Sequence, residues 1–292
     1  MIYYVKHDSI KFLVSSAKFN EAREMIKQVY DSNEHGNAII DHIEMSSQKE
    51  TSSVSLKDAI TSPHYRRATF VALMMIVFHE LTGENAIMLY STEIFKKMSS
   101  YKDGYALEPR TGTILIGVFN LLAHIPAIYL IKLLPRRILL VTGHLIMAAC
   151  HILVGAFAAG SDDIGVIVMM IIFITTYVIT TGPIIWLYVS EIVVDSALGV
   201  CLFTLWSMIL LLSLFTNVLM ESFLRPEGVF WIFGISSLFG AWFNYNYVKE
   251  TSTLSDRGKK SLYMQSMISI CRNTIKEGGS LDSAGNYQIR KP

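Results

Sequence analysis

The stretch that decides the fold is Phe78–Phe95, FHELTGENAIMLYSTEIF, which lies in a long apolar run that opens just after Arg66 and Arg67. The part of a membrane helix that lies inside the bilayer is usually apolar. A charge there costs a few kcal/mol or more unless it faces a cavity, a substrate or an ion. The stretch nevertheless places four polar side chains within one or two helical turns of one another: His79, Glu80, Glu84 and Asn85. It therefore predicts both a membrane span and a functional site.

The composition also indicates a membrane protein. The chain has 292 residues, of which 52% are hydrophobic and 17% are charged, whereas about a quarter of the residues are charged in a soluble globular domain. A formal net charge of +1, without a basic arm, argues against nucleic-acid binding. The three cysteines are isolated and are interpreted as small apolar side chains. We expect no disulfide framework, no metal site and no cofactor.

Six apolar spans follow the first 65 residues. Each span is close to the roughly 20 residues that a helix needs to cross the hydrocarbon. Each must be helical, because lipid offers the backbone no hydrogen-bond partners. We therefore predict an all-α membrane protein, a six-transmembrane-helix bundle with short cytosolic helices before it. The spans are placed at 68–90, 112–131, 138–159, 164–188, 197–220 and 228–248.

The chain is expected to divide into three parts. Residues 1–66 form a cytosolic linker with amphipathic helices, at about 16–29 and at 56–60, and residues 67–248 form the bundle. Residues 249–292 form a flexible cytosolic tail. Lys and Arg near the span ends are more numerous on the side where the bundle begins and ends. The orientation predicted for this multi-pass protein places both termini in the cytosol, and the sequence does not indicate which membrane.

Several motifs, in a fixed order, resemble one family. LTGENAIMLYSTEIF, residues 81–95, is similar to the seventh-helix motif QQLSGINAxxYYSTxIF of sugar porters in the major facilitator superfamily. Further segments resemble that family's eighth helix, tenth helix and loops: Gly117 with Asn120, Arg136-Arg137, Gly182-Pro183-Ile184 with Trp186, Ser190-Glu191 and Glu250-Thr251. The resemblance covers residues 5 to about 255 and corresponds to the C-terminal six-helix half of such a transporter.

The resemblance implies a function. Family members, the facilitative glucose transporters among them, hold a sugar between two six-helix bundles and move it by alternating access. We therefore expect transport of a hexose-like sugar or related small polar solute, by uniport or coupled to protons. A second six-helix bundle or a second copy of the chain would supply the other half. The alternative is a non-transporting half that acts as a membrane sensor, regulator or assembly partner.

A sugar site needs amides or carboxylates and an aromatic ring, all facing a wet cavity near the midplane. The paired glutamines that bind sugar in the family are His79 and Glu80 here. For Asn85 and Asn120, interhelical hydrogen bonding remains an alternative role. For Trp186, the alternative is an anchor at the membrane interface. The candidate substrate-binding residues are His79, Glu80, Asn85, Asn120 and Trp186.

Proton coupling is a second hypothesis for the same region. Glu80 and Glu84 are four residues apart and share a helix face, and His124 lies one turn beyond Asn120. Carboxylates and imidazoles near the midplane can carry protons, so Glu80, Glu84 and His124 are the candidates. Their alternative is relaxed selection in a homologue that no longer transports.

No enzyme is indicated. His79-Glu80 begins an HExxH zinc motif, but its fifth position is Gly83, so the second ligand is missing. His144 and His151 lie in the third span, where packing or a polar contact is a better interpretation than a metal site. The expected partners are the lipid bilayer and a small polar solute.

Overall fold

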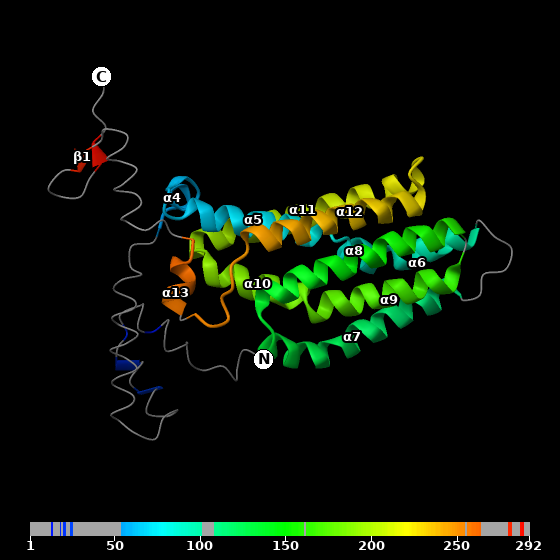
Figure 1. The fold of residues 1–292 in the computed structure, drawn as a ribbon, viewed down its shortest axis with the longest axis horizontal. Coiled ribbons are helices and arrows are strands. Elements are labelled where there is room, and N and C mark those ends of the chain that lie inside the picture. The colour runs from blue at the N-terminus through cyan, green and yellow to red at the C-terminus, as the bar shows by residue number, and fades with distance from the viewer. Residues whose placement is uncertain are drawn as a thin grey trace. The chain divides into compact units, whose positions relative to one another are not determined.

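The computed structural model describes residues 13, 18, 20, 21, 24, 25, 54–100, 108–160, 162–254, 256–263, 280, 281, 287 and 288. The chain splits into two compact units, Met1–Val54 and Ser55–Pro292, and most of the described residues form a helix bundle in the second (Figure 1). The amphipathic helix predicted at 16–29 lies largely outside the described residues. The short helix predicted at 56–60 corresponds to α4, Leu56–Thr61.

The helices of the bundle follow the predicted spans closely, but two of the spans are broken. The first contains α5 (Arg66–Glu80) and α6 (Glu84–Ser100), and the fourth contains α9 (Asp163–Ile179) and α10 (Thr181–Ile192). The remaining elements are α7 (Pro109–Leu133), α8 (Arg136–Gly160), α11 (Asp195–Glu221), α12 (Arg225–Tyr247), α13 (Asp256–Ser261), β1 (Ser280–Leu281) and β2 (Tyr287–Gln288). The two short strands pair antiparallel, with Ser280 opposite Gln288.

Among the described residues, five helical stretches are long and apolar enough to cross a membrane: Arg66–Lys96, Pro109–Leu133, Arg136–Gly160, Ile164–Ile192 and Asp195–Glu221. The sixth predicted span forms α12, which has 23 residues but is not among these five. Serines, glycines and asparagines lower its hydropathy, and it packs along α8 (Figure 1). The connection between the first two predicted spans, 68–90 and 112–131, is shorter than expected, because α6 continues to Ser100 and α7 begins at Pro109.

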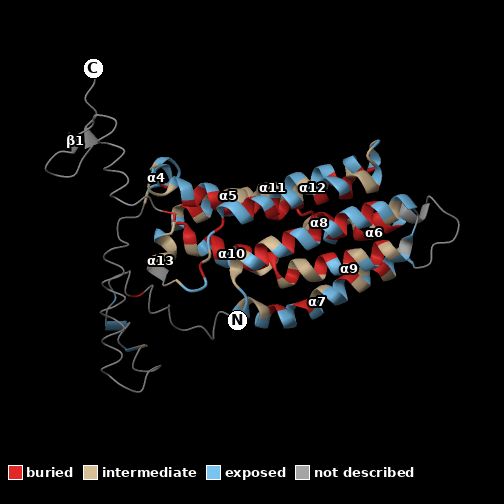
Figure 2. Cartoon of the chain, viewed as in Figure 1, coloured by how far each residue is buried: buried red, intermediate tan, exposed pale blue. Residues whose placement is uncertain are grey.

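Close packing of α8 against α12 makes these two helices the centre of the bundle. A Cβ added at Gly234 of α12 would lie 3.3 Å from the His151 Cβ, and one added at Gly155 of α8 would meet the Trp231 ring. The absence of side chains at both positions lets the helix backbones approach each other. Of the 18 most apolar consecutive residues in each helix, 56% are buried in α8, against 17% in α7 and 11% in α11. Figure 2 shows the burial along each helix.

One end of the bundle, which we call the basic end, is where α5 and α8 begin and α12 ends. The Arg136 guanidinium there donates to the Glu191 carboxylate and to the Thr251 hydroxyl. The Lys259 ammonium of α13 lies 2.9 Å from the same Glu191 carboxylate. Tyr263 is buried, and its hydroxyl lies 2.7 Å from the Tyr188 hydroxyl. The first residues after α12 are therefore packed onto the bundle.

Glu250 anchors that segment to the start of α8. Its two carboxylate oxygens accept hydrogen bonds from the backbone N–H groups of Arg136 and Arg137, at 3.2 and 3.0 Å, and one also accepts from Ser252 at 2.9 Å. Burial would raise the pKa of the Glu250 carboxyl, but these bonds outweigh burial and hold it below the ordinary 4.5. A carboxylate at a helix N-terminus is also favoured by the helix dipole.

Candidate functional site

The break between α5 and α6 forms because Gly83 has a backbone conformation that other residues rarely adopt, with φ +80°. A Cβ at this position would also lie 2.6 Å from the Phe233 ring of α12. The Thr82 hydroxyl and backbone N–H both donate hydrogen bonds to the His79 carbonyl oxygen, at 2.6 and 3.2 Å. The break is thus a compact turn pressed against α12, and its freed backbone groups need partners.

One of those partners comes from another helix. The His151 Nε2 of α8 lies 2.7 Å from the Thr82 carbonyl oxygen, so the ring carries its proton on Nε2 and donates. His151 is fully buried, and its ring contacts the rings of Phe173, Phe230 and Phe233. This bond fixes the turn between α5 and α6 to the centre of the bundle.

The second break, at Thr180 between α9 and α10, brings Tyr177 to the first. A Cβ at Gly182 would lie 3.1 Å from the Tyr177 ring, so the glycine leaves room for that ring. The Tyr177 hydroxyl lies 3.0 Å from the His79 Nε2 and also hydrogen-bonds to the Glu84 carboxylate. One tyrosine therefore connects the end of α5 with the start of α6.

Glu80 completes the cluster at the break. Its Oε2 accepts a hydrogen bond of 2.8 Å from the Asn85 Nδ2, and its Oε1 lies 3.9 Å from the His79 Nε2. The exposed fractions of His79 and Glu80 are only 3% and 2%, whereas Glu84 and Asn85 are half-buried. The structure thus brings together four of the predicted site residues, two facing inward and two partly outward.

The other three predicted residues lie elsewhere. Asn120 is half-buried on α7, and His124 is exposed one turn further on, with its Nδ1 2.8 Å from the Asn120 carbonyl. Trp186 of α10 is 46% exposed and lines a small apolar hollow between α5, α10 and α11, together with Ile76 and Leu205. None of these three has a described contact with the residues at the α5–α6 break.

Sequence reasoning missed Tyr177 as a site residue and gave no partners to the histidines of α8. The interpretation of His144 and His151 as polar contacts is confirmed: the His144 Nδ1 lies 2.8 Å from the Leu140 carbonyl and 3.3 Å from the Asn244 Nδ2. In the described part of the chain, no group of three or more His, Cys, Asp or Glu side chains could hold a metal ion. The signal in the sequence that could have indicated Tyr177 is its polar hydroxyl within an apolar span, five residues before Gly182.

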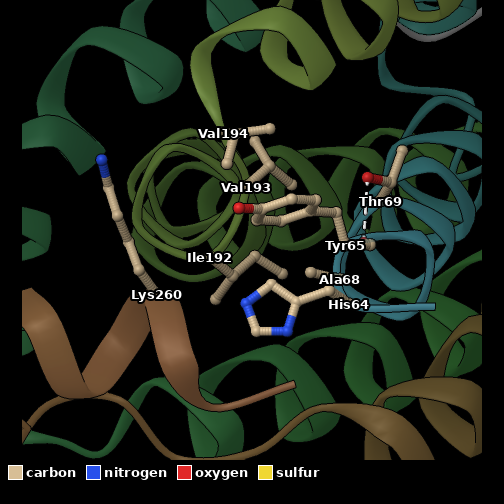
Figure 3. A pocket seen from close by; sticks show the side chains of 8 residues that line it. All are labelled: His64, Tyr65, Ala68, Thr69, Ile192, Val193, Val194 and Lys260. Atoms are coloured by element: carbon tan, nitrogen blue, oxygen red, sulfur yellow. Dashed lines mark hydrogen bonds between the residues drawn. The ribbon is translucent and has the colours of Figure 1, made fainter. Parts of the chain in front are cut away.

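A small hollow at the basic end lies apart from the break (Figure 3). It contains none of the predicted site residues. Most of its lining is apolar, and within the cluster the Thr69 hydroxyl donates to the Tyr65 carbonyl at 3.2 Å. The lining residues are His64, Tyr65, Ala68, Thr69, Ile192, Val193, Val194 and Lys260.

Two interrupted membrane helices that meet at polar groups near the midplane are typical of secondary transporters. Solved structures share the fold of this bundle. The chain is similar to the major facilitator superfamily proton:xylose symporter XylE, with a TM-score of 0.72 and 21% identity over 90% of this chain and 56% of that one. An inward open structure of XylE from E. coli gives a TM-score of 0.65 and 20% identity over 91% of this chain and 53% of that one.

The chain belongs to the Sugar (and other) transporter family, whose model matches residues 1–256. This confirms the predicted family and, with the solved structures, the predicted fold of a six-helix major facilitator half. The chain is thus a multi-pass membrane protein from a family of transporters, which are not enzymes.

Curated relatives include hexose transporter 1 of Plasmodium vivax, 24% identical over 86% of this chain and 51% of the relative. The glucose transporter GlcP of Staphylococcus epidermidis is 29% identical over 85% of this chain and 55% of the relative. The galactose-proton symporter of Escherichia coli K12 is 29% identical over 63% of this chain and 40% of the relative. The chain therefore spans about half the length of the curated relatives it matches.

Proposed function

We propose that the chain moves a sugar, or a related small polar solute, across a membrane by alternating access. The observation that carries this proposal is the meeting of the two broken helices, where Tyr177 of α9 joins His79 of α5 and Glu84 of α6. Breaks in membrane helices are tolerated where they serve a cavity or a binding site. Similarity to hexose, glucose and galactose transporters supports a sugar as the solute.

Exposure separates the proposed ligands into two groups. A solute held between this bundle and a second one can be touched only by side chains that are at least partly exposed on this bundle. Asn85, Asn120 and Trp186 meet this condition, whereas His79 and Glu80 are almost fully buried. We therefore assign direct sugar contact to the first three and a supporting position behind them to the other two.

The proposed contacts suit sugar chemistry. The Asn85 amide donates one hydrogen to Glu80, which leaves a second N–H and a carbonyl for sugar hydroxyls. The Trp186 ring offers an apolar face for stacking, and it lies exposed on the helix that follows the second break. Glu84 can accept from a hydroxyl with the oxygen lone pairs that Tyr177 does not use.

Alternating access requires a second bundle for this one to rock against. The surfaces of α7 and α11 are the least buried of the five spans, and we propose that a second six-helix bundle or a second copy of the chain covers part of them. We propose that residues 1–66 and 249–292 lie in the cytosol as linker and tail, since α5 begins and α12 ends at the basic end.

The test is uptake of labelled hexoses and pentoses by liposomes that contain the purified chain. We expect saturable uptake above protein-free liposomes, reduced about tenfold or more in Asn85→Ala, since losing a hydrogen bond to a buried polar ligand costs about 1–3 kcal/mol. The matched control is Asn246→Ala, because Asn246 is exposed on α12 and bonds only to the Trp242 carbonyl among the described contacts. Absence of saturable uptake for every sugar would contradict transport by the chain alone or by paired copies of it, and would favour a sensor, regulator or assembly partner.

A further inference from the structure

The interior of the bundle holds more titratable groups than a sugar site needs. His79 and Glu80 end α5, and His144 of α8 is 1% exposed. A Cβ at Gly240 would lie 2.5 Å from the His144 ring and 3.3 Å from the Phe78 Cβ. The missing side chain of Gly240 therefore lets His144 reach the end of α5.

Several ring nitrogens in this interior have no hydrogen-bond partner. Within the described residues, the buried His79 Nδ1, His144 Nε2 and His151 Nδ1 lack one. The His144 Nδ1 lies 2.8 Å from the Leu140 carbonyl, so it carries the proton and leaves Nε2 as a free lone pair. A buried nitrogen without a partner costs stability, and its free lone pair is the atom at which the ring would take up a proton.

We propose that His79, Glu80 and His144 form one proton-binding site inside the bundle, separate from the outward-facing residues that would meet the sugar. The inference rests on the proposed function, because it assigns the ion that sugar movement would be coupled to. The Glu80 Oε1 and His79 Nε2 are 3.9 Å apart, close enough to share a proton after a small rotation of either side chain. Two imidazolium charges would repel each other, so the two rings hold one proton at a time.

The position of the site along the helices favours access from the basic end. With a rise of 1.5 Å per residue, His144 lies about 12 Å into α8 and His79 about 20 Å into α5. Asn244, whose Nδ2 lies 3.3 Å from the His144 Nδ1, is only about 5 Å from the end of α12. Asn244, His144 and His79, all buried, therefore lie at increasing distances from the basic end. His79 is closest to the middle of a hydrocarbon layer about 30 Å thick.

The titratable groups around this site are few. Glu84 of α6 and Tyr177 of α9 face it through hydrogen bonds, and His151 of α8 faces the neighbouring Thr82 carbonyl. Residues 197–220 of α11 and 228–244 of α12 contain no Asp, Glu, His, Lys or Arg. A proton that enters the site therefore has a short and defined set of partners.

The test uses infrared difference spectra of the purified full chain in lipid between about pH 4 and about pH 9. We expect a protonated-carboxyl band that titrates and disappears in Glu80→Gln. In His79→Gln and His144→Gln its midpoint should move by about one pH unit or more, a tenfold change in proton affinity. His64→Gln, at the basic end and outside this cluster, is the matched control and should leave the midpoint unchanged.

A second measurement needs no variant that could misfold. In nitrogen NMR of the wild-type imidazoles, His79 and His144 should change with the same midpoint as the Glu80 band, and His151 should not follow them. Independent midpoints, or a Glu80 band that ignores both histidine variants, would overturn the shared site. Loss of uptake with this titration intact would contradict the proposed transport alone, whereas uptake with no Glu80 titration would overturn this inference alone.

Discussion

The α5–α6 break and the basic end both tie together helices that are far apart in the sequence, but they use opposite chemistry. At the break, the connections are hydrogen bonds among buried or half-buried groups, such as His151 to the Thr82 carbonyl. At the basic end, they are ion pairs near water, with Glu191 between Arg136 and Lys259. The comparison teaches that the break should be rigid and insensitive to salt, whereas the basic end should respond to salt.

The largest expected effect is that of Gly83→Ala. The substitution forces a side chain into positive φ and against Phe233, so we expect a loss of about 2–4 kcal/mol in the free energy of unfolding in detergent. Gly117→Ala is the control, because a Cβ there meets nothing within 4 Å and alanine favours a helix. Equal unfolding free energies for the two variants would remove the claim that the break is fixed.

Removing the bond between α8 and the break should come next. His151→Leu leaves the Thr82 carbonyl buried without a donor, which we expect to cost about 1–3 kcal/mol. Hydrogen exchange at the Gly83 and Glu84 amides should also become faster. The control, His124→Leu on the exposed face of α7, should stay within about 0.5 kcal/mol of the wild type. Exchange that is unchanged in His151→Leu would show that the turn does not depend on α8.

At the basic end, Glu191→Gln should have a smaller effect that depends on salt. The side chains of Glu191, Arg136 and Lys259 are each 13% exposed, so we expect a loss of about 1–2 kcal/mol at low salt that shrinks as the salt concentration rises. Tryptic cleavage after Lys259 should become faster. Glu93→Gln removes the exposed pair with Lys96 and should cost less than about 0.5 kcal/mol. A salt-independent loss for Glu191→Gln would contradict the contrast between the two regions.

The smallest expected effect is that of Glu250→Gln, and it depends on pH. Because the pKa of the folded Glu250 carboxyl lies below its ordinary 4.5, its ionised form stabilises the fold above that pH. The contribution is lost as the pH falls through the lower, folded pKa. Unfolding curves should therefore separate wild type from variant at neutral pH and converge in acid. A difference that persists unchanged in acid would rule out this role for the carboxylate.

Much of the fold could be predicted because its signals are local. Apolar runs of the right length fix the spans, and Gly83 and Gly182-Pro183 mark the two bends. The motifs around Asn85 and Trp186 indicate the family. The sequence predicts single spans where the structure has two broken helices. It also predicts α12 as a span like the others, although α12 is not among the five most apolar stretches. Composition alone does not predict either difference.

The site was harder to predict because it depends on how the helices are rotated. His79 and Glu80 occupy positions that the motif resemblance predicts to bind sugar, yet both are buried in this bundle. Their direction is set by the close approach of α5 to α12 at Gly240 and by Tyr177, which arrives from α9. Such contacts join residues about a hundred or more positions apart, and no local pattern encodes them.

The central claim is that a polar site at the α5–α6 break binds a sugar through its outward-facing residues. The most direct measurement is equilibrium binding of labelled sugar to the purified chain in lipid, for wild type, Asn85→Ala and Asn246→Ala. The account predicts saturable binding that is weakened about tenfold or more in Asn85→Ala and is unchanged in Asn246→Ala. Binding that is absent in the wild type, or equal in all three proteins, would contradict it.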